Sequence, residues 1–109
     1  MNEPINIWQT NPCEIIPGFH GRFVHSDNAT IAYWEIDAQA VLPEHQHHHE
    51  QVVHLLSGEF ELTVAGKIIN LTPGDVLLLQ PHIPHAGRAI TDCRIMDVFN
   101  PCRDDYRQN

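Results

Sequence analysis

The stretch EQVVHLLSGEFELTV, residues Glu50 to Val64, decides the fold, because it reads as two short strands joined by a tight turn. Residues 51–56 and 59–64 are rich in β-branched, aromatic and leucine side chains, as strands are. Ser57-Gly58 lies between them, where a hairpin would reverse direction. The stretch therefore predicts a pair of neighbouring antiparallel strands.

The same pattern continues on both sides of this hairpin. Residues 31–37, 67–71, 75–79 and 93–99 also read as strands, and turn signals such as Pro73-Gly74 separate them. None of the eight prolines is central to a predicted strand. The chain is therefore predicted to be all-β, a sandwich, jelly roll or barrel, with a less regular first 30 residues and a polar tail after Pro101.

A histidine tract precedes the hairpin: residues 43–51 read PEHQHHHEQ. Alternate side chains of an extended strand point the same way, so His45 and His47 offer two imidazoles to one point, and Gln51 can complete the set if the chain turns. His85 follows at a distance. The alternative is a solvated, weakly basic loop, but strand-like sequence flanks the tract on both sides, so it is not a tag. The spacing predicts a metal site formed by His45, His47, Gln51 and His85.

Length and charge restrict the class of protein. The 109 residues suffice for one domain with a single core. The net charge of −8, with six Lys and Arg residues, argues against nucleic acid or an anionic membrane as a partner. The longest apolar run, residues 76–79, is far too short to span a membrane. Cys13, Cys93 and Cys102 form neither a paired set nor a CxxC motif, so a reducing cytoplasm is the expected location.

The histidine tract and the turn that follows it resemble the two motifs of the cupin superfamily. The first motif is matched by His45, His47, Gln51 and Gly58, and the second by Pro73-Gly74-Asp75 and Pro84-His85. The chain departs from the motifs at four turn positions, where Gln39, Gln80, His82 and Ala89 replace Gly, Pro, Gly and Asn. The resemblance implies a cupin-type double-stranded β-helix, a jelly-roll barrel, over residues 1–109. Its motif core is about 39–89, and the N-terminal arm 1–30 is expected in dimer contacts.

A narrower resemblance lies at the end of the chain. Residues 97–106 read DVFNPCRDDY and resemble the DVFSPxREDY ending of the small cupins called KdgF. This family implies a homodimeric enzyme that converts 4,5-unsaturated uronates, small anionic sugars released by pectin or alginate lyases, into linear keto acids. It also implies that Asp97, Phe99 and Arg103 handle the substrate. HxH motifs alone are shared by cupins of many activities, so the tail is the more discriminating feature.

The residue types suit this chemistry. Three imidazoles and one amide are neutral, so a divalent ion (Ni, Zn, Mn, Fe or Co) would keep its charge and attract an anion. If residues 93–99 are a regular strand, Asp97 and Phe99 share its inner face, and Asp97 could act as a general base near the ion. Arg103 has the fork geometry that binds carboxylates. The alternatives are a surface Asp97, an Arg103 paired with Asp104 or Asp105, and a Phe99 that belongs to the core.

Two other functions stay open at this point. Cupins with similar ligands include metal-dependent dioxygenases and isomerases, and a non-catalytic sugar-binding cupin would use the metal only to hold its ligand. Arg22 and Arg88 are further candidates for substrate contacts. His49 is expected beside the metal ligands rather than among them. Trp8, Tyr33 and Trp34 are expected in the core or in dimer contacts.

Overall fold

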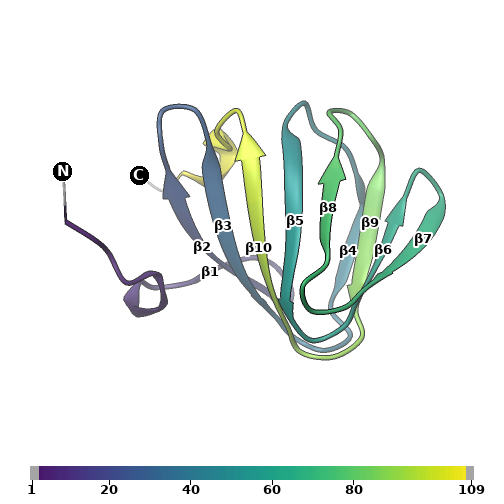
Figure 1. Cartoon of the computed structure of the whole chain (residues 1–109). Coiled ribbons are helices and arrows are strands. Elements are labelled where there is room, and N and C mark those ends of the chain that lie inside the picture. Colours follow the sequence, from purple (N-terminus) through teal and green to yellow (C-terminus); the bar gives the residue numbers. More distant parts are fainter. Residues whose placement is uncertain (1–2, 108–109) are drawn as a thin grey trace.

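The computed structural model describes residues 3–107, which form two antiparallel sheets facing each other (Figure 1). The strands are β1 (Cys13–Ile16), β2 (Phe19–His25), β3 (Thr30–Ile36), β4 (Val41–His45), β5 (Glu50–Ser57), β6 (Phe60–Val64), β7 (Lys67–Leu71), β8 (Val76–Leu79), β9 (His85–Ala89) and β10 (Cys93–Asn100). Two short 3-10 turns, η1 (Ile7–Gln9) and η2 (Asp104–Tyr106), lie near the ends. The order is β1-β2-β3-β10-β5-β8 in one sheet and β4-β9-β6-β7 in the other. This confirms the predicted jelly-roll β fold.

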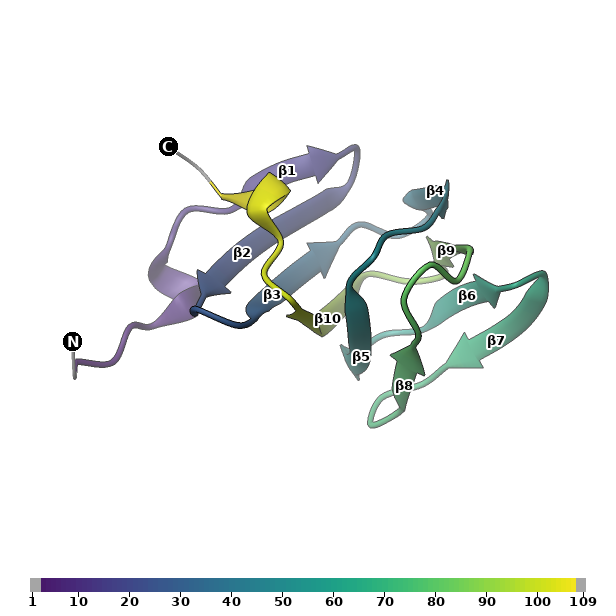
Figure 2. The same cartoon turned by 90° about the horizontal axis from the view of Figure 1, so that it is seen from above.

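The two strands predicted on either side of Ser57-Gly58 are confirmed, but the predicted pairing of these strands with each other is wrong. β5 and β6 correspond to the predicted strands, although they enter different sheets, so the turn at Ser57-Gly58 joins the two layers (Figure 2). Gly58 has a positive φ of 87°, and a Cβ atom there would lie 2.2 Å from the carbonyl oxygen of Asp92. Only glycine fits this position without a backbone shift.

Four strands lie where the sequence predicts none. β1 and β2 occupy residues 13–25 of the arm expected to be less regular, and β2 pairs with β3 along its whole length. β4 and β9 pair with each other, although β4 contains Pro43 and β9 reads HAGRA. Ladder hydrogen bonds come from the backbone, so a strand of low intrinsic propensity forms when its neighbours place it beside a partner.

The core lies between the two sheets and follows the two-residue period of the strands. In β3, residues 30, 32, 34 and 36 are buried and the residues between them are half-buried. In β10, Cys93, Ile95, Asp97 and Phe99 are buried, which confirms that they share one face. No helix within residues 3–107 is long and apolar enough to cross a membrane.

Two of the turn positions that depart from the cupin motifs have an unusual backbone. Gln39 and His82, which stand where the motifs have glycine, have positive φ angles of 71° and 65°. The left-handed turn is therefore kept at both positions without glycine, at a cost on the order of 1 kcal/mol each. The departures change the residue and leave the turn geometry intact.

Candidate metal centre and cavity

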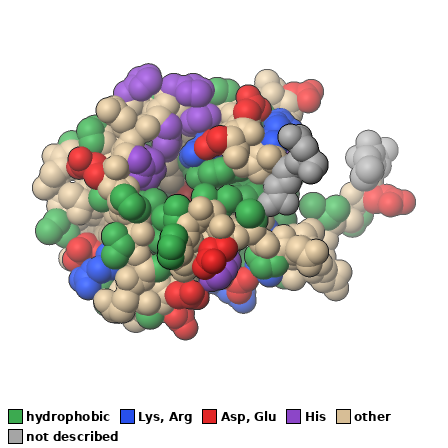
Figure 3. Space-filling model, turned by 180° about the vertical axis from the view of Figure 1, so that it is seen from behind, with side chains coloured by type: hydrophobic (Ala, Val, Ile, Leu, Met, Phe, Trp, Pro, Cys, Tyr) green, Lys and Arg blue, Asp and Glu red, His purple; other side chains and the backbone are tan. Residues whose placement is uncertain are grey.

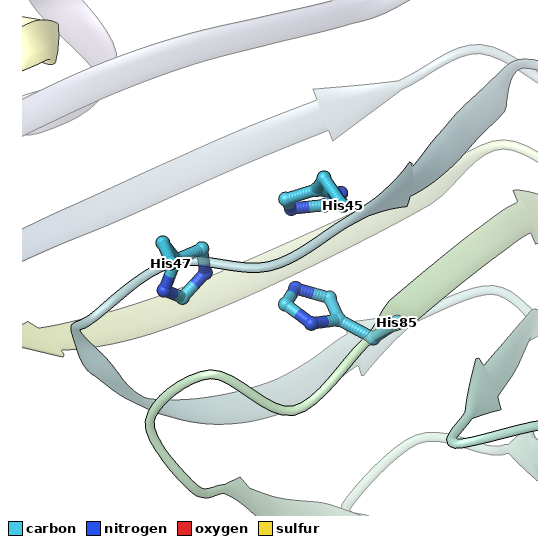
Figure 4. A group of neighbouring side chains, drawn as sticks. All are labelled: His45, His47 and His85. Atoms are coloured by element: carbon cyan, nitrogen blue, oxygen red, sulfur yellow. The ribbon is translucent and has the colours of Figure 1, made fainter.

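Three histidines converge at one end of the space between the sheets. His45 ends β4, His85 begins β9, and the two are paired in register across these strands. His47 lies in the turn that follows β4 and points toward the same place (Figure 4). Their ligating nitrogen atoms all lie within 4.8 Å of one another. The structure therefore brings together the three imidazoles that the sequence selected.

Backbone carbonyl groups fix the orientation of each ring. The Nδ1 atoms of His45, His47 and His85 donate to the carbonyl oxygens of Pro43, His49 and Ile83, at 2.9, 3.1 and 2.9 Å. Since each Nδ1 carries the hydrogen, each Nε2 keeps its lone pair, as metal-binding histidines require. The Nε2 atom of His85 is buried and has no hydrogen-bond partner among the described residues. An unpartnered buried acceptor of this kind fits a cation.

Two of the three imidazoles, those of His47 and His85, are held in the neutral form. Burial lowers the pKa of His47 to about 4, and the positive charge of Arg103 acts in the same direction. Burial also lowers the pKa of His85. Because only a neutral imidazole can ligate a metal ion, these shifts keep the site ready to bind at ordinary pH.

Gln51 stands where a fourth ligand fits. Its side chain comes from β5, is 8% exposed, and places Oε1 3.1 Å from the Nε2 atom of His47. Neighbouring ligands at right angles around one ion, with bonds of about 2.1 Å, lie about 3.0 Å apart. The residues present therefore fit a divalent ion with three nitrogen ligands and one neutral oxygen ligand.

A cavity of about 340 Å³ extends from this cluster into the space between the sheets. His45, His85 and Gln51 lie at its polar end, and histidine side chains gather over one end of the molecule in Figure 3. The rest of the lining is mostly apolar and comes from both sheets. Its apolar members are Ile15, Ile16, Phe19, Trp34, Ile36, Leu42, Pro43, Val53, Phe60, Leu62, Ile95 and Phe99. The size and lining fit a small ligand with a polar group directed at the histidines.

Asp97 is the buried acidic group of this cavity. Its side chain is 6% exposed, and the indole Nε1 of Trp34 donates to its Oδ2 atom at 3.0 Å. The other oxygen, Oδ1, has no hydrogen-bond partner among residues 3–107. Burial raises the pKa of Asp97 to about 6, although the nearby Gln51 amide and the hydrogen bond from Trp34 favour the ionised form. The alternative of a surface Asp97 is therefore wrong, and the carboxylate has a free oxygen and a pKa suited to proton transfer.

Arg103 is already paired within the chain. Its Nε and Nη2 atoms donate to the two carboxylate oxygens of Asp105, at 3.0 and 2.7 Å. The guanidinium group lies over the rings of Phe99 and Tyr106, at 4.7 and 4.0 Å from their centroids. The alternative of an Arg103–Asp105 pair is confirmed. Arg103 still lines the cavity, so only the part of its fork outside this pair is open to a ligand.

Other candidates lie outside the cavity lining. Arg22 pairs with Glu35, and the exposed Arg88 contacts Gln39, so the structure does not support their predicted substrate contacts. His49 is buried and lies beside the metal ligands, as expected. Its carbonyl group accepts a hydrogen bond from His47, and its ring is not part of the cluster.

Sequence reasoning missed two residues of the site. Trp34 was expected only in the core or in a dimer contact, yet it is the hydrogen-bond partner of Asp97 across 63 positions of sequence. Tyr106 lines the cavity and stacks on Arg103. The only signal for Tyr106 was its place in the C-terminal motif, and nothing local distinguishes Trp34 from an ordinary core residue.

This combination of a two-sheet jelly roll and converging histidines defines a class of protein. A model of the family described as Cupin domain matches residues 32–99. The chain belongs to the cupin family, and it is a small single-domain cupin that resembles KdgF.

Two solved structures show how far this likeness extends. KdgF from Halomonas sp. superimposes with a TM-score of 0.91 at 26% identity, over 98% of this chain and all of that one. An RmlC-like cupin from Shewanella frigidimarina gives a TM-score of 0.87 at 30% identity, over 92% of this chain and 91% of that one.

Among curated proteins, the similar relatives are L-ectoine synthases. The one from Nocardia farcinica is 40% identical over 68 residues, which make up 61% of this chain and 52% of the relative. The chain thus spans about half the length of the curated relatives it matches. The comparisons and the histidine cluster together describe a metal-binding cupin whose ion is divalent.

Proposed function

We propose that this cupin is a metal-dependent enzyme that converts 4,5-unsaturated uronates into linear keto acids. The observation that carries the proposal is the free Oδ1 atom of Asp97, a buried carboxylate oxygen in the same cavity as the histidine cluster. The structural likeness to KdgF over 98% of the chain supports the proposal, because membership of that family implies this activity. The three ligand histidines and Gln51 would hold the ion.

The reaction is an isomerisation, so atoms and electrons balance without a co-reactant. Asp97 removes the proton of the anomeric hydroxyl group, the bond between the anomeric carbon and the ring oxygen breaks, and an aldehyde and an enolate form. Protonated Asp97 gives this proton to the carbon of the enolate double bond that bears no oxygen, which yields the ketone. The bound ion supplies Lewis-acid stabilisation of the negative charge that develops on oxygen.

The remaining residues position the sugar. Trp34 holds Oδ2 of Asp97, so that Oδ1 is the atom that exchanges the proton. Phe99 is 2% exposed and forms an apolar wall beside His47, at a ring separation of 5.8 Å. Arg103 contributes positive charge at the cavity, moderated by Asp105. A substrate carboxylate is thus attracted to the same end as the histidines.

A second candidate function is an activity like that of the L-ectoine synthases. Two observations favour it: several of these relatives are 37–41% identical over the matched residues, and the cavity lining is mostly apolar. An apolar lining leaves the hydroxyl groups of a sugar with few partners. A dioxygenase, an isomerase of another substrate and a non-catalytic sugar-binding cupin are further alternatives within the family.

The test is to follow the ultraviolet absorbance of the unsaturated bond with 4,5-unsaturated galacturonate or mannuronate and metal-loaded protein. The proposal expects the absorbance to fall with wild type and to persist with Asp97→Asn at equal metal content. Formation of L-ectoine in a parallel assay, or oxygen uptake by an iron-loaded sample, with no loss of absorbance would reject the uronate reaction. Binding of the uronate without turnover would indicate a sugar-binding cupin.

A further inference from the structure

The cavity between the sheets is larger than the sugar proposed as its substrate. An unsaturated uronate has about 12 non-hydrogen atoms and fills roughly 190 Å³ at the packing density of about 0.75 that proteins have. The cavity measures about 340 Å³, so roughly 150 Å³ is left over. Because folded proteins contain few voids larger than a water molecule, a space of this size indicates room for a further ligand group.

The strand registers arrange the cavity lining in layers. The first layer holds the histidines, with Gln51 opposite Phe99. Asp97 lies one layer deeper along β10, and Ile95, opposite Trp34, lies in the third layer. Four residues of strand separate Phe99 from Ile95, so the layers extend over about 13 Å. The metal ligands and the Asp97 carboxylate therefore occupy the first two layers and leave the rest of this length to other groups.

The lining deeper than the histidines is apolar on both sheets. The only side-chain polar atom among its six most prominent members is Nε1 of Trp34, which already donates to Asp97. Water finds no hydrogen-bond partner in such a place, and apolar cavities of about 150 Å³ stay dry and bind molecules of the size of benzene. We call these six side chains, each at most 6% exposed, the deep lining: Phe19, Trp34, Ile36, Phe60, Leu62 and Ile95.

Two strand irregularities direct further apolar side chains at the cavity. The register of β1 shifts between Glu14 and Ile16, and the adjacent residues Ile15 and Ile16 both line the cavity. The register of β4 shifts after Leu42, and Leu42 and Pro43 both line it. A regular strand would turn every second side chain away, and bulges that redirect side chains are typical beside functional sites. Because these four lining residues are half-buried or exposed, they border the mouth, so a ligand enters past an apolar rim.

We propose that the deep lining is a hydrocarbon subsite, so that the protein binds a small carboxylate that carries an apolar group of about five or six carbon atoms. The carboxylate lies in the histidine layer, near Arg103, and the hydrocarbon lies against the deep lining. The opposite orientation would bury a charge among apolar side chains and beside the Asp97 carboxylate, which is unfavourable.

The experiment is a calorimetric titration of the zinc-loaded full chain with the straight-chain carboxylates acetate, butyrate, hexanoate and octanoate. Each buried methylene group should raise the affinity about fourfold, so hexanoate should bind roughly 200-fold more tightly than acetate. Octanoate should bind no more tightly than hexanoate, because the subsite is then full. Equal affinities of wild type for acetate and hexanoate would overturn the proposal.

Leu62→Phe is the variant that fills the subsite, since its larger side chain occupies space that the hydrocarbon needs. It should lower the affinity for hexanoate at least about tenfold and leave the affinity for acetate and the zinc content unchanged. Ile68→Phe is the matched control, because Ile68 is 60% exposed and lies outside the cavity lining, and it should bind all four carboxylates like wild type. A chain-length dependence that Leu62→Phe leaves intact, or that Ile68→Phe also removes, would contradict the assigned subsite.

A second variant acts in the opposite direction, so that misfolding cannot imitate its effect. Leu62→Ala enlarges the subsite, and octanoate should then bind more tightly than hexanoate; a preference unchanged from wild type would reject the proposal. The hydrocarbon subsite goes beyond the uronate reaction and does not rest on it, because uronate conversion enters none of these readouts. A protein that converts the uronate without any dependence on chain length would retain the proposed function and lose the subsite.

Discussion

Replacing Asp97 with Asn should stabilise the metal-free protein and abolish the proposed uronate conversion by the metal-loaded protein. The substitution keeps the shape of the side chain and the acceptor for Trp34, but it removes a charge that is buried between the sheets. A carboxylate whose second oxygen has no partner is costly to ionise in such a place. A buried side chain that lowers the stability of the folded protein is typically retained for function.

The magnitude follows from the pKa. Burial raises the pKa of Asp97 from the ordinary 3.8 to about 6. Each difference of one in pKa corresponds to about 1.4 kcal/mol, so the ionised carboxylate costs the folded protein about 3 kcal/mol at pH 7. Because the folded state binds this proton more tightly, the contribution of Asp97 to the unfolding free energy falls as pH rises from about 4 to about 6, and is constant above.

The assay is urea unfolding in the presence of a chelator, at several pH values between 4 and 7. Asp97→Asn should exceed wild type by about 2–3 kcal/mol at pH 7, and the difference should vanish near pH 4. His47 contributes with the opposite sign, since its pKa is lowered and its stabilisation grows as pH rises, but both proteins share it and it cancels.

Asp104→Asn is the control, because that carboxylate is 85% exposed and should change stability by less than about 0.5 kcal/mol. Turnover of an unsaturated uronate should fall at least about 100-fold in Asp97→Asn, the usual contribution of a general base. A stability difference that is absent, or independent of pH, would refute the reasoning.

Three further predictions concern the metal ligands and one turn. Gln51→Glu should retain metal but raise KM for an anionic uronate by about tenfold or more, since the carboxylate cancels charge at the ion; an unchanged KM would contradict the role of the neutral ligand. In the metal-free protein, the His47 imidazole should stay neutral down to about pH 5 when followed by NMR, because burial lowers its pKa to about 4; a His47 ring that titrates near pH 6.5 would contradict its burial. His82→Gly should raise the unfolding free energy by about 0.5–1 kcal/mol, because glycine adopts the positive φ at this position without the steric strain of a side chain. The control is His48→Gly, at an exposed turn position without positive φ, which should lower the unfolding free energy. Equal effects of His82→Gly and His48→Gly would rule out backbone strain at residue 82.

The strands that the sequence predicted are those whose own residues favour extended structure. β5, β6 and β7 combine β-branched or leucine side chains with turn residues at their ends, so local pattern and tertiary position agree. β9, with Gly87 in its middle, carries no such pattern. Gly87 lies where a Cβ atom would come within 2.4 Å of the Phe60 ring, so its residue type reflects packing rather than propensity.

The metal ligands were predictable because the information is in their spacing. His45 and His47 alternate along one segment, and His85 follows a recognisable turn, so the convergence needs only a two-sheet fold. The Trp34–Asp97 hydrogen bond joins neighbouring strands that are 63 positions apart in the chain, and no local pattern marks it.

The most direct test of the account is elemental analysis of purified protein, with wild type beside His85→Ala. The convergence of His45, His47 and His85, with Gln51 beside them, predicts about one divalent ion per chain in wild type and a loss of most of it in the variant. Wild-type protein that binds no ion when offered Ni, Zn, Mn, Fe or Co, or a variant that binds as much, would contradict the central claim that these side chains form one metal centre.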